Sequence, residues 1–321
     1  MLVYVLNQHG QPLMPCSARK ARLLLKQKKA VVVRMEPFTI KLLYGSTGYK
    51  QEVSLGVDCG SKHIGMSATT KERELYAADV TLRNDITDLL STRRQNRRAR
   101  RNRLRYRQAR FNNRVHSKNK GWLAPSVEHK IQTHFKVIEN VYKILPVKKM
   151  IVETASFDIQ KIKNPDIHNE QYQQGEQLGF WNVREYVFFR DGHTCQCCKG
   201  KSKDLILNVH HIESRKTGGN APSNLITLCE TCHKGYHKGT VQLPKNIKRG
   251  MSFKDATFMG VMRWVLYNRL KAIYDNVSMT YGYITKNTRI KNNLPKDHYI
   301  DARCISGNPL AKPLGYVFYQ K

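Results

Sequence analysis

Two pairs of cysteines have the spacing of ligands to a single metal ion. Cys195 and Cys198 form one C-x-x-C pair, and Cys229 and Cys232 form a second about thirty residues later. Each pair can offer two thiolates at ~2.3 Å from a tetrahedral Zn²⁺. Four thiolates leave no coordination position for water, so we expect a structural zinc, the alternative being four unrelated buried cysteines. Cys197 leaves the register of the run CQCC open.

The segment that spans the second pair also carries histidines and an asparagine. NVHHIESRKTGGNAPSNLITLCETCHKGYH resembles the HNH nuclease motif, with its His-rich strand, central Asn and final His. The resemblance implies a ββα-metal site in which His211 is the general base that deprotonates water. It also implies that His210 and His233 hold one Mg²⁺ beside the scissile phosphate, while Asn224 fixes the loop between strand and helix by hydrogen bonds. His237 is a second candidate ligand, and a zinc knuckle with incidental histidines is the alternative.

Four residues elsewhere predict a second site for phosphodiester cleavage. Asp58 and Glu153 each end a hydrophobic strand, in LGVDC and MIVET. His298 and Asp301 are spaced i, i+3, which places both on one face of a helix. A single acid at a strand end is more typical of a cap or a solvated group. Together, however, they fit two-metal cleavage, in which carboxylates from separate elements converge on ions ~3.5–4 Å apart.

This set of acids resembles a split RuvC nuclease of the RNase H type. The resemblance implies that Asp58, Glu153 and Asp301 bind two Mg²⁺ ions. It also implies that His298 activates or orients the attacking water. The cysteine–histidine segment would then be inserted between the second and third RuvC segments.

Residues 93–114, RRQNRRARRNRLRYRQARFNNR, hold eleven arginines and no acid in twenty-two positions. On a helix they would occupy every side, which leaves almost no apolar face to bury. The planar guanidinium grips phosphates with two hydrogen bonds and stacks on bases, so we expect a nucleic-acid partner. The alternative is a solvated basic arm without a fixed partner. The arginines are Arg93, Arg94, Arg97, Arg98, Arg100, Arg101, Arg103, Arg105, Arg107, Arg110 and Arg114.

Strands and helices must hold these residues in place. Strands are expected where β-branched and aromatic residues cluster, in VYVLN, AVVVRM, EVSLGVDC, HIGMSATT, RELYAADVTLR, VKKMIVETASF, SMTYGYITKNTRIKNN and GYVFYQK. Helices are expected where apolar residues recur at helical spacing, in SARKARLLLKQKKA, APSVEHKIQTHFKVIENVYKILP, FWNVREYVFFRDG, DATFMGVMRWVLYNRLKAIY and PKDHYIDARCISG. The polar stretch 158–178 is interpreted as a linker.

Taken together, these motifs resemble the IscB family of transposon-encoded, RNA-guided DNA nucleases. The resemblance covers about residues 1–320 and includes QPLMPC near the start. It implies an α/β fold: an RNase H-like (RuvC) core split in sequence, an inserted ββα-metal HNH domain with a four-cysteine zinc knuckle, and a small N-terminal β-rich domain. The implied domains are a PLMP-type domain (1–50), RuvC segment I (51–90), a bridge helix (91–118), RuvC segment II (119–160), the HNH nuclease domain (178–245) and RuvC segment III (250–321).

The same resemblance implies how the parts act. The bridge helix would contact a guide RNA and its heteroduplex with the target, where protein reads backbone shape and base pairing reads sequence. HNH would cut the guide-paired strand of double-stranded DNA, and RuvC would cut the displaced strand. The implied cofactors are two Mg²⁺ in RuvC, one Mg²⁺ in HNH, one structural Zn²⁺ and the guide RNA, with one chain per RNA.

Composition agrees with a polyanionic partner. Lys and Arg outnumber Asp and Glu by 56 to 24, which gives a net charge of +32 over 321 residues. No apolar run approaches the ~18 residues of a membrane span, so we expect no membrane partner. MLVYVLNQHGQPLMP lacks the features of a signal peptide. We therefore expect a reducing, cytoplasmic location, nucleoid-associated if the source is prokaryotic.

Two other functions fit part of the sequence. A protein-only HNH DNA endonuclease of the homing type would explain the zinc cassette and the charge, but not the three acid segments. A non-cleaving RNA- or DNA-binding relative would keep the fold without the chemistry. The presence of Asp58, Glu153, Asp301 and His211 argues against that second alternative.

Overall fold

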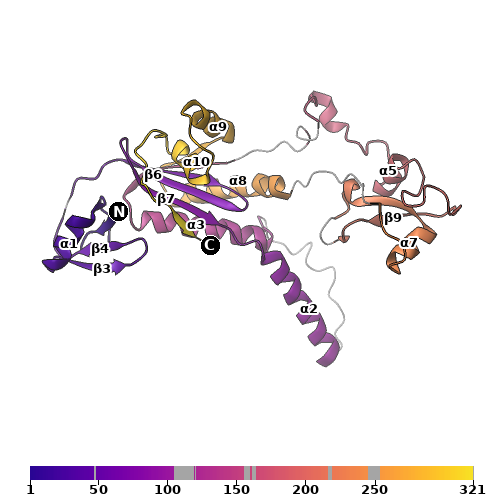
Figure 1. The fold of residues 1–321 in the computed structure, drawn as a ribbon, viewed down its shortest axis with the longest axis horizontal. Helices are drawn as coiled ribbons and strands as arrows, with labels where there is room; N and C mark the ends of the chain where they lie inside the picture. Colours follow the sequence, from indigo (N-terminus) through magenta and orange to yellow (C-terminus); the bar gives the residue numbers. More distant parts are fainter. Residues whose placement is uncertain are drawn as a thin grey trace. The chain divides into compact units, whose positions relative to one another are not determined.

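The structure, a computed structural model, describes residues 1–46, 48–104, 119, 121–154, 160, 164–215, 219–244 and 254–320. The chain divides into two compact units (Figure 1). The first unit combines Met1–Phe157 with Lys254–Lys321, and the second comprises Asp158–Phe253. The second unit is therefore an insertion into the sequence of the first. Of the helices described, none is both long and apolar enough to cross a lipid bilayer.

The first unit begins with a small sheet and one helix. Its strands lie in the order β2-β1-β4-β3. Ser17 caps α1, because its hydroxyl accepts a hydrogen bond from the Lys20 amide at 3.3 Å. The sequence predicted β1, α1 and β3, but not the short strands β2 and β4. The elements are β1 (Leu2–Leu6), β2 (Cys16–Ser17), α1 (Ala18–Lys26), β3 (Ala30–Arg34) and β4 (Thr39–Leu42).

A six-stranded sheet forms the rest of the first unit, in the order β11-β8-β5-β6-β7-β12. β5, β6 and β7, which are three of the predicted strands, form an antiparallel meander. β8 runs parallel to β5, β11 runs parallel to β8, and β12 runs parallel to β7. The strands are β5 (Val53–Cys59), β6 (His63–Thr69), β7 (Glu74–Thr81), β8 (Val147–Glu153), β11 (Val277–Thr280) and β12 (Phe318–Gln320).

One face of this sheet carries the main core. Leu55 and Val57 of β5 are fully buried there, together with apolar side chains of two amphipathic helices. Those helices are α3 (Pro125–Tyr142) and α8 (Lys254–Ile273). The sequence predicted both from their helical spacing of apolar residues.

The opposite face of β5 and β6 takes the short helix α10 (His298–Ile305). Alternation along β5 places Gly56 and Asp58 on this face, away from the main core. A Cβ atom at Gly56 would overlap the backbone of Ala302, and one at Gly65 of β6 would overlap the carbonyl of His298. The two glycines thus allow the helix backbone to lie directly on the sheet.

One stretch differs from its prediction. SMTYGYITKNTRIKNN was expected to be strand-like, but only β11 is a strand, and α9 (Gly282–Lys291) follows it. The β-branched residues of α9 favour a strand locally. Thr285 is buried in the helix, and α9 packs against α10. Tertiary packing therefore overrides the local preference.

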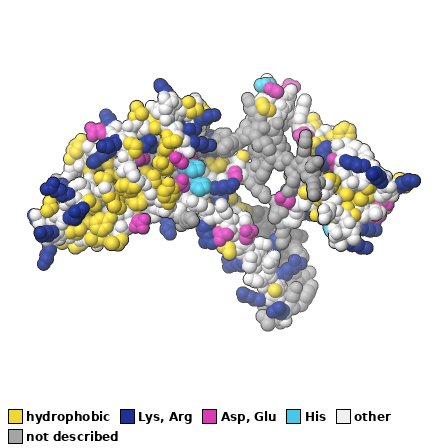
Figure 2. Space-filling model, viewed as in Figure 1, with side chains coloured by type: hydrophobic (Ala, Val, Ile, Leu, Met, Phe, Trp, Pro, Cys, Tyr) yellow, Lys and Arg dark blue, Asp and Glu magenta, His cyan; other side chains and the backbone are white. Residues whose placement is uncertain are grey.

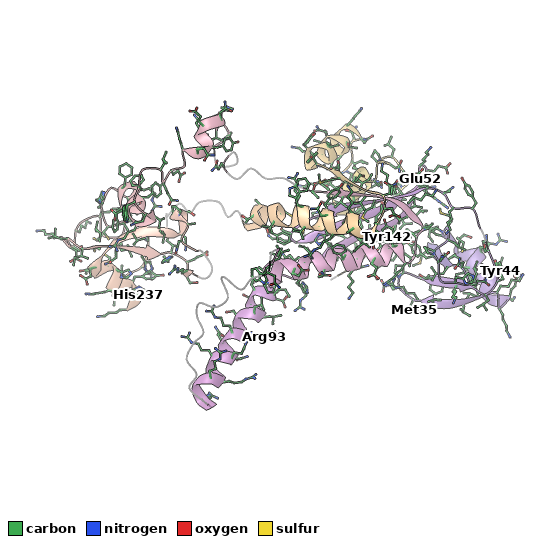
Figure 3. The ribbon with its side chains drawn as sticks, turned by 180° about the vertical axis from the view of Figure 1, so that it is seen from behind. Met35, Tyr44, Glu52, Arg93, Tyr142 and His237 are labelled. Carbon is green, nitrogen blue, oxygen red and sulfur yellow. The ribbon has the colours of Figure 1, made fainter. Side chains whose placement is uncertain are left out.

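The arginine-rich run begins in α2 (Ile86–Leu104), which starts five residues before the predicted bridge helix, 91–118. All seven arginines that the structure describes in the run are exposed: Arg93, Arg94, Arg97, Arg98, Arg100, Arg101 and Arg103. Figures 2 and 3 show basic side chains along this helix. Arg105, Arg107, Arg110 and Arg114 lie outside the described residues.

The second unit contains a hairpin followed by a helix. β9 and β10 pair antiparallel, and α7 follows β10 without a break. Part of the predicted linker forms a short 3-10 helix, η1. The described elements are η1 (Asn169–Gln173), α5 (Val183–Arg190), β9 (Leu207–His211), η2 (Pro222–Asn224), β10 (Leu225–Cys229) and α7 (Glu230–His237).

Gly65→Ala should detach α10 from the sheet, because its new methyl group would overlap the backbone of the helix. Overpacking of this kind costs about 1–3 kcal/mol or more. Urea titrations should show that loss in the free energy of unfolding. Gly260→Ala in α8 is the matched control, since no atom lies within 4 Å of its added Cβ. The control should be neutral or slightly stabilising. Equal stabilities of Gly65→Ala and the unmodified chain would contradict the close packing of α10 against Gly65.

Candidate metal centres

Two acidic residues lie side by side at the ends of parallel strands. Asp58 is the penultimate residue of β5, and Glu153 is the last residue of β8. They are direct partners in the parallel register of the two strands. Because paired residues of neighbouring strands point to the same face, both carboxylates are directed toward α10.

Helix α10 adds a histidine and a third acid. His298 Nδ1 lies 2.8 Å from Asp58 Oδ2. Asp301 lies one turn further along the same helix, and its Oδ1 forms an ion pair with Arg289 Nε of α9 at 2.9 Å. This arrangement depends on Gly65, which is the strand partner of Asp58. In Figure 2, histidine and acidic side chains lie together on the visible face of this unit.

The carboxylates influence one another's ionisation. Burial, and then the charge of Asp58, raises the pKa of Glu153 to about 7. Burial and Asp58 also raise the pKa of Asp301, although Arg289 opposes the shift. The hydrogen bond to Asp58 raises the pKa of His298. The site therefore holds more negative charge than its own cations balance, which fits divalent cations held by oxygen ligands.

A glycine lies against the Glu153 carboxylate. A Cβ atom at Gly282 would lie 2.9 Å from Glu153 Oε1. Gly282 is the first residue of α9 and follows β11 after one intervening residue. The backbone can approach the carboxylate this closely because residue 282 has no side chain.

Sequence reasoning missed a second histidine at this site. The His63 ring stacks on the His298 ring, with centroids 5.0 Å apart and planes at 8°. His63 Nδ1 lies 3.2 Å from Asp79 Oδ1 of β7. His63 and Asp79 thus help to hold the His298 ring in position. Neither residue stands out in the sequence, because their role appears only once α10 is docked.

The four predicted zinc ligands come together in the second unit. The sulfur atoms of Cys195, Cys198, Cys229 and Cys232 all lie within 4.8 Å of one another. Cys198 Sγ and Cys229 Sγ are 3.8 Å apart, and neither cysteine forms a disulfide. Cys197 Sγ instead donates to the carbonyl of Gln242, at 3.4 Å. The geometry therefore selects the 195–198 register of CQCC and fits a tetrahedral Zn²⁺.

Three histidines form a separate cluster in the same unit. The ligand atoms of His210, His233 and His237 lie within 4.8 Å of one another. His233 and His237 (labelled in Figure 3) are one turn apart on α7, and their Nε2 atoms are 3.3 Å apart. Burial, and then the neighbouring histidines, lowers the pKa of His210 to about 4, so its imidazole is neutral.

The donor set of this cluster fits a transition-metal ion better than the predicted Mg²⁺. Neutral imidazoles suit Zn²⁺ and similar ions, whereas Mg²⁺ prefers oxygen ligands. Sequence reasoning left His237 as a second candidate, and the structure places it with the other two. The signal that could have selected it is the i, i+4 spacing of His233 and His237 on a helix.

The loop between β9 and β10 is held by an asparagine. Asn224 Oδ1 accepts a hydrogen bond from the Glu213 amide at 2.8 Å. Its Nδ2 donates to the carbonyls of Glu213 and Gly219, at 3.0 and 2.9 Å. Next to Gly219, Asn220 Oδ1 lies 3.0 Å from His211 Nε2. Asn224 was predicted to fix a loop between strand and helix, and it connects a loop between two strands instead.

Two known protein families match parts of this chain. The chain matches the RRXRR protein family over residues 3–175, more than half of its length. It belongs to the RRXRR protein family. It also matches the HNH endonuclease family over residues 195–239, which include both cysteine pairs and all three histidines of the cluster. The HNH match supports the predicted enzyme class, an endonuclease.

Solved structures show a weaker likeness. Crystal structures of Streptococcus thermophilus Cas9 in complex with the AGAA PAM, the AGGA PAM and the GGAA PAM match this chain with TM-scores of 0.39, 0.38 and 0.39. The identities are 12%, 13% and 14%, over 58%, 58% and 59% of this chain. The matches cover 26% of each Cas9 chain, so this RRXRR protein spans about a quarter of their length. No curated protein matches the chain.

Cys229→Ser should remove one thiolate from the cysteine cluster and weaken Zn²⁺ binding, which in a unit of this size is coupled to folding. Elemental analysis should show the loss of one zinc equivalent per chain, and the melting temperature of the second unit should fall. Cys197→Ser is the matched control, because its sulfur lies outside the cluster. Unchanged zinc content and melting in Cys229→Ser would refute the site.

Glu153 should make the first unit less stable as pH rises. Its pKa is raised from 4.5 to about 7, so folding favours its protonated form, and that stability is lost between about pH 4.5 and 7. In Mg²⁺-free buffer, Glu153→Gln should gain about 1–3 kcal/mol over the unmodified chain between pH 5 and pH 8. Urea titrations measure the difference. Glu52→Gln, at an exposed residue, should show no such trend. A pH-independent difference for Glu153→Gln would contradict the raised pKa.

Proposed function

We propose that this RRXRR protein is an RNA-guided DNA endonuclease of the IscB type, which hydrolyses phosphodiester bonds in both strands of a DNA target. The observation that carries the proposal is the convergence of Asp58, Glu153 and Asp301 on one face of a sheet. Asp58 and Asp301 lie 243 positions apart in the sequence, and a unit with an HNH match is inserted between them. A single-site HNH nuclease has no use for such a set of carboxylates.

The sheet supports the assignment of a split RuvC core. An antiparallel meander of three strands, extended by two parallel strands beside its first, is an RNase H-like arrangement. In this proposal the three RuvC segments are residues 51–90, 119–160 and 250–321. The N-terminal sheet is the PLMP-type domain (1–50), and the HNH nuclease domain is residues 178–245.

In the RuvC site, Asp58, Glu153 and Asp301 would hold two Mg²⁺, which supply charge stabilisation and a more acidic water when bound. His298 is the residue placed to handle a proton. Its Nδ1 is held by Asp58 and its side chain is 44% exposed, so Nε2 can orient water. His63 and Asp79 act as positioning residues, since His63 stacks on His298 and Asp79 holds His63.

In the HNH site, His211 is the proposed general base. When its Nε2 donates a hydrogen bond to Asn220 Oδ1, Nδ1 carries the lone pair that takes the proton from water. Asn224 keeps that geometry by fixing the loop that holds Asn220. The metal would be held by His210 and His233 together with His237, and the four-cysteine cluster would hold a structural Zn²⁺.

Charge supports the guide RNA as a partner. The net charge of +32 and the exposed arginines of α2 favour binding to phosphate backbones. A guide RNA and a double-stranded DNA target together supply many more phosphates than a short protein-read DNA site. We propose one chain per guide RNA, with HNH cutting the guide-paired strand and RuvC the displaced strand.

The test begins with RNA that co-purifies with the full chain, which should have a uniform length. A DNA duplex that matches the sequenced guide is then incubated with Mg²⁺ and Zn²⁺, with each strand labelled separately. The unmodified chain should cut both strands. His211→Ala should leave only the guide-paired strand intact, and Asp58→Ala should leave only the displaced strand intact. In each case the rate at the lost site should fall by at least about 10²-fold.

Two surface variants control for general damage, His9→Ala and Asp275→Ala, because both side chains are exposed. Cleavage without bound RNA would instead favour the protein-only HNH endonuclease. Bound RNA without cleavage of either strand would favour a non-cleaving relative. Loss of both cuts from either single substitution would refute the assignment of two separate sites.

A further inference from the structure

Three exposed aromatic side chains and one arginine form a group at the start of α9. Trp264, Tyr281 and Tyr283 are 50%, 38% and 66% exposed. The rings of Tyr281 and Tyr283 are stacked, with centroids 6.0 Å apart and planes at 13°. The Arg263 guanidinium lies 4.7 Å from the centroid of Trp264 and 5.8 Å from that of Tyr281. We call these four residues the aromatic platform.

The aromatic platform adjoins the carboxylate site. Thr280, the last residue of β11, is the strand partner of Glu153. Gly282 comes so close to Glu153 that its Cβ would lie 2.9 Å from Oε1. Tyr281 and Tyr283 flank Gly282 directly in sequence. The platform therefore begins within one residue of a backbone that contacts a proposed catalytic carboxylate.

Core packing does not account for these rings. The buried residues that α8 gives to the core are Met259, Met262, Leu266 and Leu270, and Trp264 is not among them. Arg263 Nε is buried, and in the described part of the chain it has no hydrogen-bond partner. A buried donor of this kind normally has one, and an anion would supply it. The Arg263 guanidinium therefore lies against the rings of Trp264 and Tyr281, and its Nε–H group is available to donate a hydrogen bond to a ligand.

The charge around the platform fits a phosphodiester backbone. Helix α9 carries Lys286 and Lys291, besides Arg289, which is paired with Asp301, and it has no acidic residue. The last turn of α8 adds Lys271. Exposed aromatic rings interleaved with cations are the features by which proteins bind single-stranded nucleic acid. In a duplex the π-faces of the bases are covered by neighbouring pairs, so a stacking surface selects unpaired bases.

We propose that the aromatic platform is a binding subsite for unpaired nucleobases of the DNA strand that the Asp58 site cuts. The proposal rests on the proposed function for the identity of that strand. Bases stack on Tyr281, Tyr283 and Trp264, while Arg263 and the lysines of α9 contact the flanking phosphates. The stacked bases fix the register of the strand, and the next phosphodiester is thereby placed at the carboxylates.

The binding test uses the full chain, freed of nucleic acid at high salt and kept in Mg²⁺-free buffer so that nothing is cut. Two fluorescent probes are compared, an oligothymidine and an abasic oligodeoxynucleotide of the same length and charge. Tyr281→Ala/Tyr283→Ala should bind the oligothymidine about tenfold more weakly, given that stacking contributes ~1–3 kcal/mol per base. Its affinity for the abasic probe should not change, because the phosphate contacts remain.

Two variants control the experiment. Tyr319→Ala removes an exposed tyrosine, 77% exposed, from β12 at the opposite edge of the sheet, and should bind both probes normally. Tyr281→Phe/Tyr283→Phe keeps both rings and should also bind normally. An equal loss for both probes in the double alanine variant would overturn the proposal, and so would no loss for either.

A second measurement needs no variant. An oligonucleotide that contains 5-iodouracil should crosslink under light to Tyr281, Tyr283 or Trp264 of the unmodified chain, as mapped by mass spectrometry. Crosslinks confined to other peptides would overturn the proposal. Crosslinks at the platform in a chain that does not cleave DNA would refute the proposed function alone. Asp58-dependent cleavage without platform crosslinks would refute only the proposed subsite.

Discussion

The first unit depends on the close contact between α10 and the part of the sheet where Gly56 and Gly65 have no side chains. Gly56 and Gly65 remove the two Cβ atoms that would keep the helix away from β5 and β6. With the backbones in contact, the first turn of α10 delivers His298 and Asp301 to Asp58. A larger residue at either glycine would push α10 away from the sheet and so separate Asp301 from Asp58 by about the thickness of a side chain. Packing and chemistry thus depend on the same two positions.

Holding several carboxylates together reduces stability, and the structure shows how that loss is limited. Burial and mutual repulsion raise the pKa of Glu153 and Asp301, so their charged forms are disfavoured without added cations. Arg289 offsets part of the repulsion through its ion pair with Asp301. The remaining excess of negative charge would favour the binding of divalent cations. Stability and ion binding therefore oppose each other here.

The inserted unit has a small apolar cluster, and a bound metal ion would be a second source of its stability. Its buried cluster contains five residues among those described, three of which are cysteines. With few apolar residues in this cluster, metal coordination would be a usual additional source of stability. The two C-x-x-C pairs hold the start and the end of the β9–β10 region, and they position α7 with its two histidines. A metal ion at the four cysteines would therefore give the unit a source of stability of its own.

The sequence alone determined whatever depends on near neighbours in the chain. The spacing of the cysteine pairs, the i, i+3 pair on α10 and the helical periods of α3 and α8 each follow from local geometry. Only the tertiary structure decided that Asp58 faces Glu153, that His63 stacks on His298, and that the residues after β11 form a helix. These features arise from strand register and from the docking of α9 and α10. Both join residues far apart in sequence, and no local pattern encodes such contacts.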